Sequence, residues 1–487
     1  MTAQTTESDH EMNQTMTEPE TAPVLKTEAV DAWLTPGRFA LLLALLVVAA
    51  FPDVLLQGKT FVARDFGAFS YPVAFYHRQC FWRGEIPLWN PLNFCGVPFL
   101  AQWNTMTLYP GSLIYLLLPM PWSLSFFCLA HLFWGGLGMY FLARRWTGNC
   151  LAAGLAGIIF SFNGLMLNFL MWPSHVATFG WLPWVLWLVP EGWRQGGRKL
   201  VWGILAGSMQ MLAGGPETIL FTWLILFLLM CGEWITFSKR TYAEIPDAGA
   251  RNRIPLRFLC LAVLVTLVCA AQLLPFLELV AHSDRDASYS AHSPNWSMPI
   301  WGWLNFLVPL FRTRPASQGI FFQPNQDWTS SYYAGTGTVL LTAVALGRRR
   351  EWKVRLLAVA ALSCLLLALG NRGYVYPVLH RFFPPVGFFR YPVKFLILVL
   401  ASAPLLAAGG LAALTRNDGT KLGRFEVSSA SLILVLVGAV LAFAWGHPIP
   451  GEIRVVVLRN GCTRAGLLVL GVLAVGMLIK STGPRRT

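Results

Sequence analysis

Residues 392–415 read PVKFLILVLASAPLLAAGGLAALT and contain no charged side chain after Lys394. An α-helix needs about 20 consecutive apolar residues to cross the hydrocarbon core of a bilayer, and this stretch is long enough. The rest of the chain has a similar character, because 55% of its 487 residues are hydrophobic and only 12% are charged. This composition excludes a water-soluble globular protein and predicts an all-α polytopic membrane protein.

Eleven other segments are apolar over a comparable length, which gives about twelve predicted membrane spans. The predicted spans are 38–56, 122–142, 151–171, 175–190, 199–214, 217–235, 256–280, 331–347, 354–370, 392–415, 427–447 and 463–480. The stretch 106–119 (MTLYPGSLIYLLLP) is shorter and bracketed by prolines, so we expect an interfacial or re-entrant segment there. The glycine-rich run at 135–138 in the second span indicates close helix packing, since small residues let helices approach in a membrane.

The loops between these spans differ in positive charge. One set of alternate loops, together with both chain ends, holds 23 of the 37 Lys and Arg residues, although the opposite loops are longer. Cytoplasmic loops carry the excess of Lys and Arg in membrane proteins. The charge pattern therefore predicts that both termini are cytoplasmic.

Residues 1–36 are polar and rich in Asp and Glu, and we expect a disordered cytoplasmic tail there, followed by one membrane domain over 37–487. The formal net charge of +14 raises the question of a nucleic-acid partner. The basic residues are scattered at span ends and do not gather on one polar face, as a nucleic-acid interface requires. We therefore expect the lipid bilayer as the partner and no nucleic acid.

Two large loops, at about 57–121 and 281–330, then fall on the extracytoplasmic side. Long loops within a compact domain usually carry function. In the first loop, residues 66–83 predict a short amphipathic helix in the membrane interface. Cys80 and Cys95 share this loop, where a disulfide and two separate thiols are both compatible with the sequence.

Asp65, in the run VARDFGAF, is the strongest candidate for catalysis. A carboxylate beside an apolar, aromatic-rich interface is partly desolvated, which suits it to accept a proton from a hydroxyl group. The alternatives are a helix N-cap for residues 66–83 or an ion-pair partner of Arg64. Asp53, at the outer end of the first span, is a second candidate, since an intramembrane carboxylate is a functional hypothesis by default.

Arg390 and Lys394, in FFRYPVKF, flank the start of the tenth span. Pro392 fits the first helical position, so unpaired backbone N–H groups and two cations would meet there. This arrangement predicts a site for a lipid phosphate. The alternative is that both side chains anchor the span at the interface, as cationic residues at span ends usually do.

His175 and Glu217 also lie at outer span ends and could converge with Asp65, although each residue type is more often a helix-end cap. The loop that contains His282, Asp284, Asp286 and His292 has the residue types of a metal site but no recognised ligand spacing. A divalent metal therefore remains open as a cofactor and no ligand is assigned. The sequence contains no Walker motif, HExxH or GxSxG.

The order of these segments resembles that in the YfhO family of bacterial membrane proteins, which belongs to the GT-C class of polytopic glycosyltransferases. The matching pieces are Asp65, IPLWNP and GVPFLAQ in the first loop, LYPGSLIYLLLP, FSFNGLMLNF with His175 and GWLPW, AGGPET, SYYAGTGTVLLTAVAL and FFRYPVKF. The resemblance runs from about residue 38 to about residue 415 and weakens in the last two spans. Where the family has a His-Pro-Gln-like turn, this chain has Gly215-Pro216-Glu217, so the resemblance assigns no role to Glu217.

The resemblance implies a GT-C-like fold that transfers a sugar from a polyprenyl-phosphate donor to a cell-envelope acceptor, at the outer face of the bacterial cytoplasmic membrane. It also implies an acidic catalytic residue in the first extracytoplasmic loop, which falls on Asp65. Two other functions stay open from the sequence. One is a transporter or flippase of lipid-linked saccharides, which is expected to show inverted repeats and broken helices. The other is a non-catalytic assembly protein.

Overall fold

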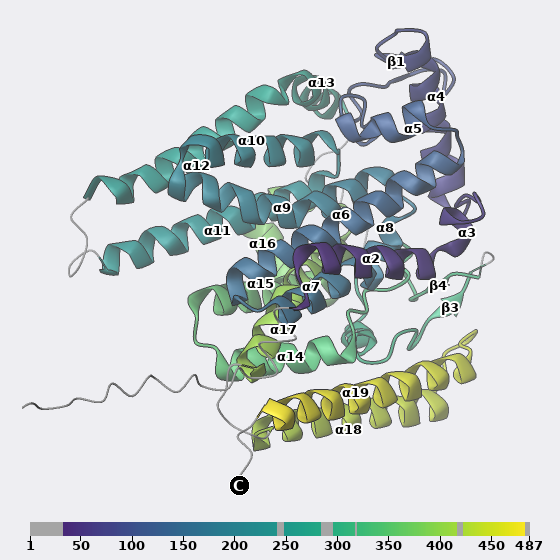
Figure 1. The fold of residues 1–487 in the computed structure, drawn as a ribbon. Coiled ribbons are helices and arrows are strands. Elements are labelled where there is room, and N and C mark those ends of the chain that lie inside the picture. The colour runs from purple at the N-terminus through teal and green to yellow at the C-terminus, as the bar shows by residue number, and fades with distance from the viewer. Residues whose placement is uncertain (1–32, 241–247, 284–295, 317–318, 416–421, 483–487) are drawn as a thin grey trace, which may run out of the picture.

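The computed structural model describes residues 33–240, 248–283, 296–316, 319–415 and 422–482. Nearly all of the predicted tail, and Asp284, Asp286 and His292 of the second large loop, lie outside these ranges. The described chain is mostly helical, as predicted (Figure 1). The longer helices are α2 (Pro36–Ala50), α4 (Tyr71–Trp82), α6 (Trp122–Thr147), α7 (Cys150–Phe162), α9 (Pro173–Gln195), α10 (Gly197–Leu212), α11 (Pro216–Arg240), α12 (Ala248–Val268), α13 (Ala270–Ala281), α14 (Thr336–Arg348), α15 (Trp352–Ala368), α17 (Leu396–Thr415), α18 (Arg424–Gly446) and α19 (Arg454–Thr482).

Short elements fill the loops between these helices. They are α3 (Pro52–Leu55), α5 (Leu113–Leu117), α8 (Gly164–Phe169), α16 (Val375–Phe382), the π-helix η1 (Phe66–Ser70), and the 3-10 helices η2 (Trp103–Thr105), η3 (Pro110–Ser112), η4 (Ile300–Phe306), η5 (Gly370–Arg372), η6 (Pro384–Phe388) and η7 (Pro392–Phe395). Each large loop also holds one antiparallel strand pair. In the first loop β1 (Trp89–Asn90) pairs with β2 (Val97–Pro98), and in the second β3 (Arg314–Pro315) pairs with β4 (Phe321–Phe322).

Each of the twelve predicted spans overlaps a helix, but three of them are broken. The first is interrupted before Pro52, which cannot donate a backbone hydrogen bond. The third stops at Asn163, whose Oδ1 accepts hydrogen bonds from the backbone of Leu165 and Met166 and thereby caps α8. The seventh bends by 80° between α12 and α13. These breaks depend on local capping and bending, which hydropathy does not register.

By length and composition, five described helices can cross a membrane, or six if α12 and α13 form one bent span. Three shorter helices, α2, α7 and α14, are also apolar. Large apolar side chains are exposed along several helices, including Leu41 on α2, Val263 on α12 and Leu470 on α19. This exposure fits contact with lipid tails. The count of twelve crossings stays a prediction.

Helix α17 lies in the core of the bundle, with nearly all of its side chains buried between α14, α15 and α7. The predicted close packing at the glycine-rich run is confirmed. A Cβ on Gly157 of α7 would stand 2.7 Å from the carbonyl oxygen of Gly136 on α6, so the two helices touch through their backbones. Helices α18 and α19 form a hairpin that packs on α14 at the edge of the bundle (Figure 1).

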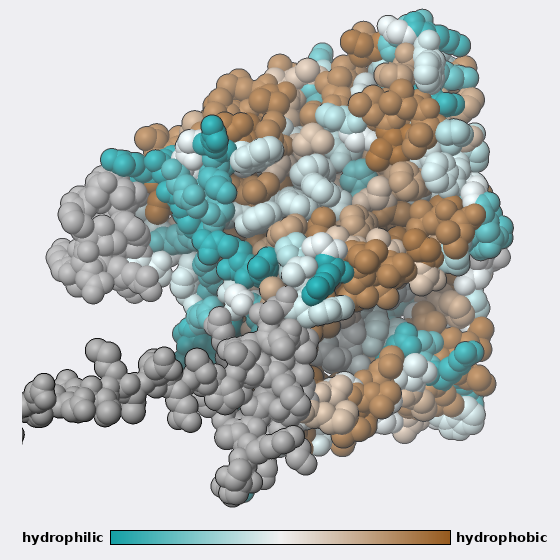
Figure 2. All heavy atoms as spheres, viewed as in Figure 1, coloured by the Kyte–Doolittle hydropathy of each residue, from teal (hydrophilic) through white to brown (hydrophobic). Residues whose placement is uncertain are grey.

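The two ends of the bundle hold different elements. The strand pairs, α3 and α4 lie at one end, and the end of α11 and start of α12 lie at the other (Figure 1). Figure 2 shows hydrophobic residues over much of the surface between them, with hydrophilic residues gathered near the α11–α12 end. This distribution is the one expected of a protein embedded in a bilayer.

Candidate active site

Four of the predicted site residues lie at the end of the bundle that holds the large loops. Asp65 directly precedes η1, and His175, Glu217 and Lys394 lie in the first turns of α9, α11 and η7. Each of these last three elements begins with a proline, a residue that favours the first helical position because it lacks an N–H. The three prolines therefore help to start these helices at the same level of the bundle, and the side chains beside them meet.

Asp65 is half-buried and held by one hydrogen bond. The indole Nε1–H of Trp172 donates to Asp65 Oδ2 over 2.7 Å. The Asp65 side chain makes no capping hydrogen bond to η1, so it is not the helix N-cap considered as one of its two alternatives. Together with His175, it lines a cavity of about 190 Å³ that also contacts Ser70, Thr105 and other polar groups. An oriented carboxylate facing a small, partly polar cavity is suited to accept a proton from a bound hydroxyl group.

Glu217 and Lys394 form an ion pair in the protein interior. Both residues are 6% exposed, and the Lys394 ammonium donates a hydrogen bond to Glu217 Oε1. Removing one partner of such a pair is costly, because it leaves an uncompensated charge in a medium of low dielectric constant. His175 lies between this pair and the Asp65 cavity, with its Nε2 atom 3.9 Å from Glu217 Oε2. The four residues thus form one continuous polar cluster.

Aromatic rings enclose this cluster. The Trp172 ring lies with its centroid 5.4 Å from that of His175 and 5.9 Å from that of Trp328. The Lys394 ammonium stands 5.2 Å from the ring centroid of Tyr391 and 5.9 Å from that of Trp328. These distances allow cation–π attraction, which adds to the ion pair in fixing the lysine.

The start of η7 differs from the predicted anion site. Lys394 is buried against Glu217, whereas the sequence predicted an outward-facing cation. The backbone N–H of Val393 donates to the carbonyl oxygen of Trp296 over 3.2 Å, so this first-turn group is already bound. Arg390 is exposed, and its guanidinium lies 5.0 Å from the ring centroid of Tyr391. The burial of Lys394 depends on a carboxylate 177 residues away in the chain, which local sequence does not reveal.

Asp53 lies apart from this cluster. It is exposed in α3, and its Oδ1 atom pairs with Lys59 Nζ over 3.1 Å. It does not line the cavity that holds Asp65. An exposed surface pair of this kind contributes little to stability. The structure therefore separates the two candidate carboxylates, and only Asp65 lines this cavity.

The far wall of the Asp65 cavity is formed by α4, α5 and the residues between them. Tyr115 lines the cavity, and its hydroxyl group lies 3.1 Å from Nδ1 of His77 on α4. Burial disfavours the charged imidazolium and lowers the pKa of His77 to about 4. His77 is therefore neutral near pH 7. The segment predicted as a helix at 66–83 is helical, as η1 followed by α4, and its position in the membrane interface stays a prediction.

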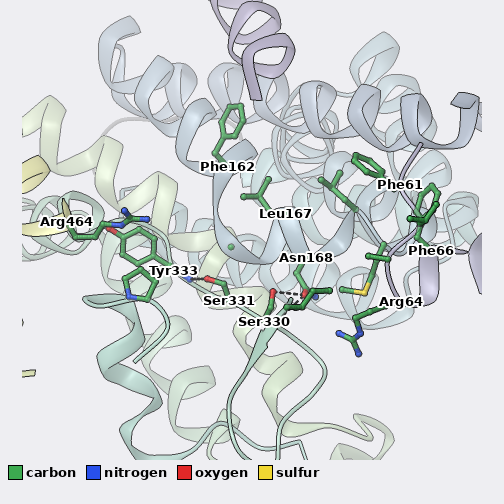
Figure 3. Close-up of a pocket in the computed structure, with 17 residues that line it drawn as sticks. Phe61, Arg64, Phe66, Phe162, Leu167, Asn168, Ser330, Ser331, Tyr333 and Arg464 are labelled. Carbon is green, nitrogen blue, oxygen red and sulfur yellow. Dashed lines mark hydrogen bonds between the residues drawn. The ribbon is translucent and has the colours of Figure 1, made fainter. Parts of the chain in front are cut away.

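A larger cavity of about 660 Å³ lies on the other side of the Asp65 segment. Its wall is largely apolar, with Phe61, Phe162 and Leu167, and Figure 3 shows Arg64 and Arg464 on opposite sides of it. Arg64 has a positive φ of 53°, a strained conformation for a non-glycine residue. Arg64 thereby lines the larger cavity while the next residue, Asp65, lines the smaller one.

Sequence reasoning missed several residues at this site. Trp172 orients Asp65, and Asn168 accepts hydrogen bonds at its Oδ1 from the backbone N–H and the hydroxyl of Ser330 beside the larger cavity (Figure 3). Trp172 stands in the segment MWPSH directly before Pro173 and His175. Trp172 directly precedes a helix that begins with proline, and this position was the sequence feature that could have indicated its role. No sequence feature indicated the contact between Asn168 and Ser330.

In the part of the chain that the structure describes, no three His, Cys, Asp or Glu side chains are grouped as metal ligands. Most of the loop around Asp286 lies outside the described residues, so its metal-binding potential stays a prediction. Cys80 is buried and Cys95 exposed, and both are thiols in the structure. The disulfide considered for them is not formed.

No family model matches the sequence, and none of the curated proteins matches it either. Among solved structures, the fold is similar to ArnT from Cupriavidus metallidurans, in crystal structures bound to undecaprenyl phosphate and in the apo state. The identity is 14% in both comparisons. The alignment to the bound form covers 90% of this chain and 73% of ArnT with a TM-score of 0.45. The alignment to the apo form covers 93% and 74% with a TM-score of 0.46. Membership in the YfhO family stays a prediction.

Proposed function

We propose that this protein is a membrane glycosyltransferase that moves a sugar from a polyprenyl-phosphate carrier to a cell-envelope acceptor, on the extracytoplasmic face of the bacterial cytoplasmic membrane. The observation that carries the proposal is the placement of Asp65. Its carboxylate is oriented by Trp172 toward a cavity shared with His175, and it does not cap the helix that follows it. The resemblance of the sequence to GT-C glycosyltransferases assigns catalysis to the same residue.

The proposed step uses Asp65 as the general base. An acceptor hydroxyl oxygen attacks the anomeric carbon of the donor sugar, and its proton passes to the Asp65 carboxylate. The bond between the anomeric carbon and the phosphate oxygen breaks, and its electron pair leaves with the polyprenyl phosphate. The products are the glycosylated acceptor and a free lipid phosphate, and the proton on Asp65 is then lost to water.

The leaving phosphate needs positive charge near the reacting carbon. Arg390 and Lys394, at the start of η7, form the phosphate side of the site in this proposal. Because Glu217 holds the Lys394 ammonium and balances its charge, we assign the direct phosphate contact to the exposed Arg390. Lys394, Glu217 and His175 hold this side of the site together.

A lipid-linked substrate also fits the larger cavity beside Asp65. Its apolar wall suits an isoprenoid segment or another lipid chain, and Arg64 and Arg464 suit a nearby anionic group (Figure 3). Arg64 of the larger cavity directly precedes Asp65 of the smaller one in the chain, so a lipid-linked donor in the larger cavity would lie beside the segment that carries the proposed base.

The second candidate function is a flippase of lipid-linked saccharides. The observations that favour it are the breaks in predicted spans, at Asn163 and between α12 and α13, since transporters bind substrate at broken helices. In a flippase the same cations would guide a phosphate across the bilayer without bond cleavage. Breakage of the sugar–phosphate bond therefore separates the two functions.

The test uses the purified protein in nanodiscs, with a panel of polyprenyl-phosphate sugars and a membrane-fraction extract as the source of acceptor. A glycosyltransferase releases free polyprenyl phosphate when donor and acceptor are both present. A parallel assay in liposomes follows transbilayer movement of the same donors. Movement of the lipid without release of polyprenyl phosphate would contradict the proposal and establish the flippase.

A further inference from the structure

A third cavity, of about 650 Å³, lies at the opposite end of the bundle from Asp65. Helices α9, α11 and α17 each begin at the candidate active site and run to this cavity, where they contribute Arg194, Glu233 and Gly409. The 19 residues from His175 to Arg194 on α9 span about 28 Å at the rise of an α-helix. The cavity is therefore separate from the active site, and the charge pattern places it on the cytoplasmic face.

Positive charge is in excess around this cavity. Its lining includes five cations, namely Arg145, Arg194, Arg349, Arg350 and Lys353. Three carboxylates face them, since Glu191 contacts Arg145 and Arg194, Glu233 contacts Arg194 and Lys353, and Glu351 contacts Arg349. Among the residues that the structure describes, the five cations therefore exceed these three carboxylates by two charges. Arg350 has no carboxylate partner among the residues that the structure describes.

Four of the five cations, all except Arg350, are paired with carboxylates, unlike charges that serve only as topology signals. Arg145 Nε lies 3.1 Å from Glu191 Oε1, and Glu191 is buried. The Lys353 ammonium lies 3.6 Å from Glu233 Oε1 and stands 5.5 Å from the ring centroid of Trp146. Side chains fixed by buried carboxylates and aromatic rings lose little further entropy when an anion binds. The cavity is thus preorganised for anion binding.

The remaining wall of the cavity is apolar. Leu405 and Leu406 of α17 and Val354 and Leu357 of α15 line it beside the cations, and Trp352 lies at its edge. Basic pockets between transmembrane helices on the cytoplasmic side bind the head groups of anionic lipids. An apolar wall adjoining the cations allows the acyl chain to lie along α15 and α17, which a free phosphate ion would not use.

We propose that this cavity binds the phosphate head group of an anionic phospholipid from the cytoplasmic leaflet. The cations hold the phosphate, and the leucine-lined wall holds the beginning of the acyl chains. This site is independent of the sugar-transfer proposal, because it needs no donor, acceptor or catalytic residue. The anionic phospholipid binds from the cytoplasmic face of the membrane, whereas the proposed polyprenyl donor binds from the extracytoplasmic face.

The test is lipid binding by native mass spectrometry, with the purified full-length protein and added phosphatidylglycerol, cardiolipin or phosphatidylcholine. We expect the two anionic lipids to bind and phosphatidylcholine to bind much more weakly. Arg350→Gln and Lys353→Gln together should weaken anionic-lipid binding by about tenfold or more, because two charge-assisted contacts are lost. The matched control for the single variant Arg350→Gln is Arg355→Gln, since Arg355 is exposed on α15, the helix that also carries Lys353, but does not line the cavity. It should bind the lipids as the wild type does.

Three outcomes would overturn the proposal. Equal binding of phosphatidylcholine would show that the cavity does not select an anionic head group. An equal loss in the cavity variant and in Arg355→Gln would show a general surface-charge effect. Displacement of bound lipid by millimolar inorganic phosphate would show that the cations bind a free anion and that the apolar wall contributes nothing. Arg350→Gln alone keeps the test valid if the double variant does not fold, because Arg350 is exposed and has no carboxylate partner in the described chain.

Discussion

Trp172 controls the orientation of Asp65, because its indole N–H is the donor to the carboxylate. Trp172→Phe keeps an aromatic ring but removes this donor. A hydrogen bond to a charged group contributes about 1.5–3 kcal/mol, so we expect kcat to fall by about tenfold or more. KM for the donor should change little, since the ring contacts remain. The measurement is steady-state sugar transfer by Trp172→Phe and by the wild type, each verified as folded in nanodiscs. An unchanged kcat in Trp172→Phe would show that the orientation of the carboxylate does not limit the reaction.

Substitutions of Arg390 distinguish its two possible roles, a phosphate contact and a membrane anchor. A guanidinium can bind a phosphate through two parallel hydrogen bonds, whereas a lysine offers a point charge. We expect Arg390→Lys to weaken donor binding and Arg390→Ala to weaken it further, by about tenfold or more. Donor affinity measured in nanodiscs checks this. If Arg390→Lys binds the donor as the wild type does, the residue acts only as an interface anchor and the phosphate contact must lie elsewhere.

At the scale of the element, the packing of α17 against α14 offers a matched pair of substitutions. A Cβ on Gly410 would overlap the carbonyl oxygen of Leu341, which belongs to the backbone and cannot move away cheaply. A Cβ on Gly409 would meet its nearest atom, Cδ of Arg349, at 3.7 Å, an ordinary contact distance. Overpacking of a core typically costs 1–3 kcal/mol, so Gly410→Ala should unfold at a clearly lower temperature than Gly409→Ala. Equal melting temperatures in detergent would mean that the two helices are not in backbone contact.

Hydropathy and charge predict much of the fold at this scale. All twelve apolar segments overlap helices, and the segment predicted as a short helix at 66–83 is helical from Phe66 to Trp82. The breaks were not predicted, since a single cap at Asn163 or a bend after Val268 leaves the apolar run intact. For the site, Asp65, His175 and Glu217 were predicted at one end of the bundle. The pairing of Glu217 with Lys394 was not predicted, because it joins two helices that are far apart in the chain.

At the scale of the whole molecule, the two ends of the bundle make the orientation testable. With both termini in the cytoplasm, position 300 lies outside and position 350 lies inside. Single cysteines at Ile300 and Arg350, both exposed sites, should differ in reaction with a membrane-impermeant thiol reagent in intact cells. The background for this experiment replaces the exposed native residues Cys95, Cys260 and Cys462. We expect labelling at 300 and none at 350. The reverse pattern would invert the protein and place Asp65 in the cytoplasm.

The central claim is that Asp65 is the base of a sugar transfer, and the chain provides its own control in Asp53. Each substitution, Asp65→Asn and Asp53→Asn, removes one carboxylate and nearly preserves shape, but only Asp65 lines the cavity with His175. The measurement is the rate of polyprenyl-phosphate release by the two variants and the wild type, each verified as folded in nanodiscs. Loss of a general base typically lowers a rate by about 10²–10⁴, so Asp65→Asn should be slower by that factor while Asp53→Asn stays close to wild type. A near wild-type rate in Asp65→Asn would contradict the account, and an inactive Asp53→Asn beside it would move the role to Asp53.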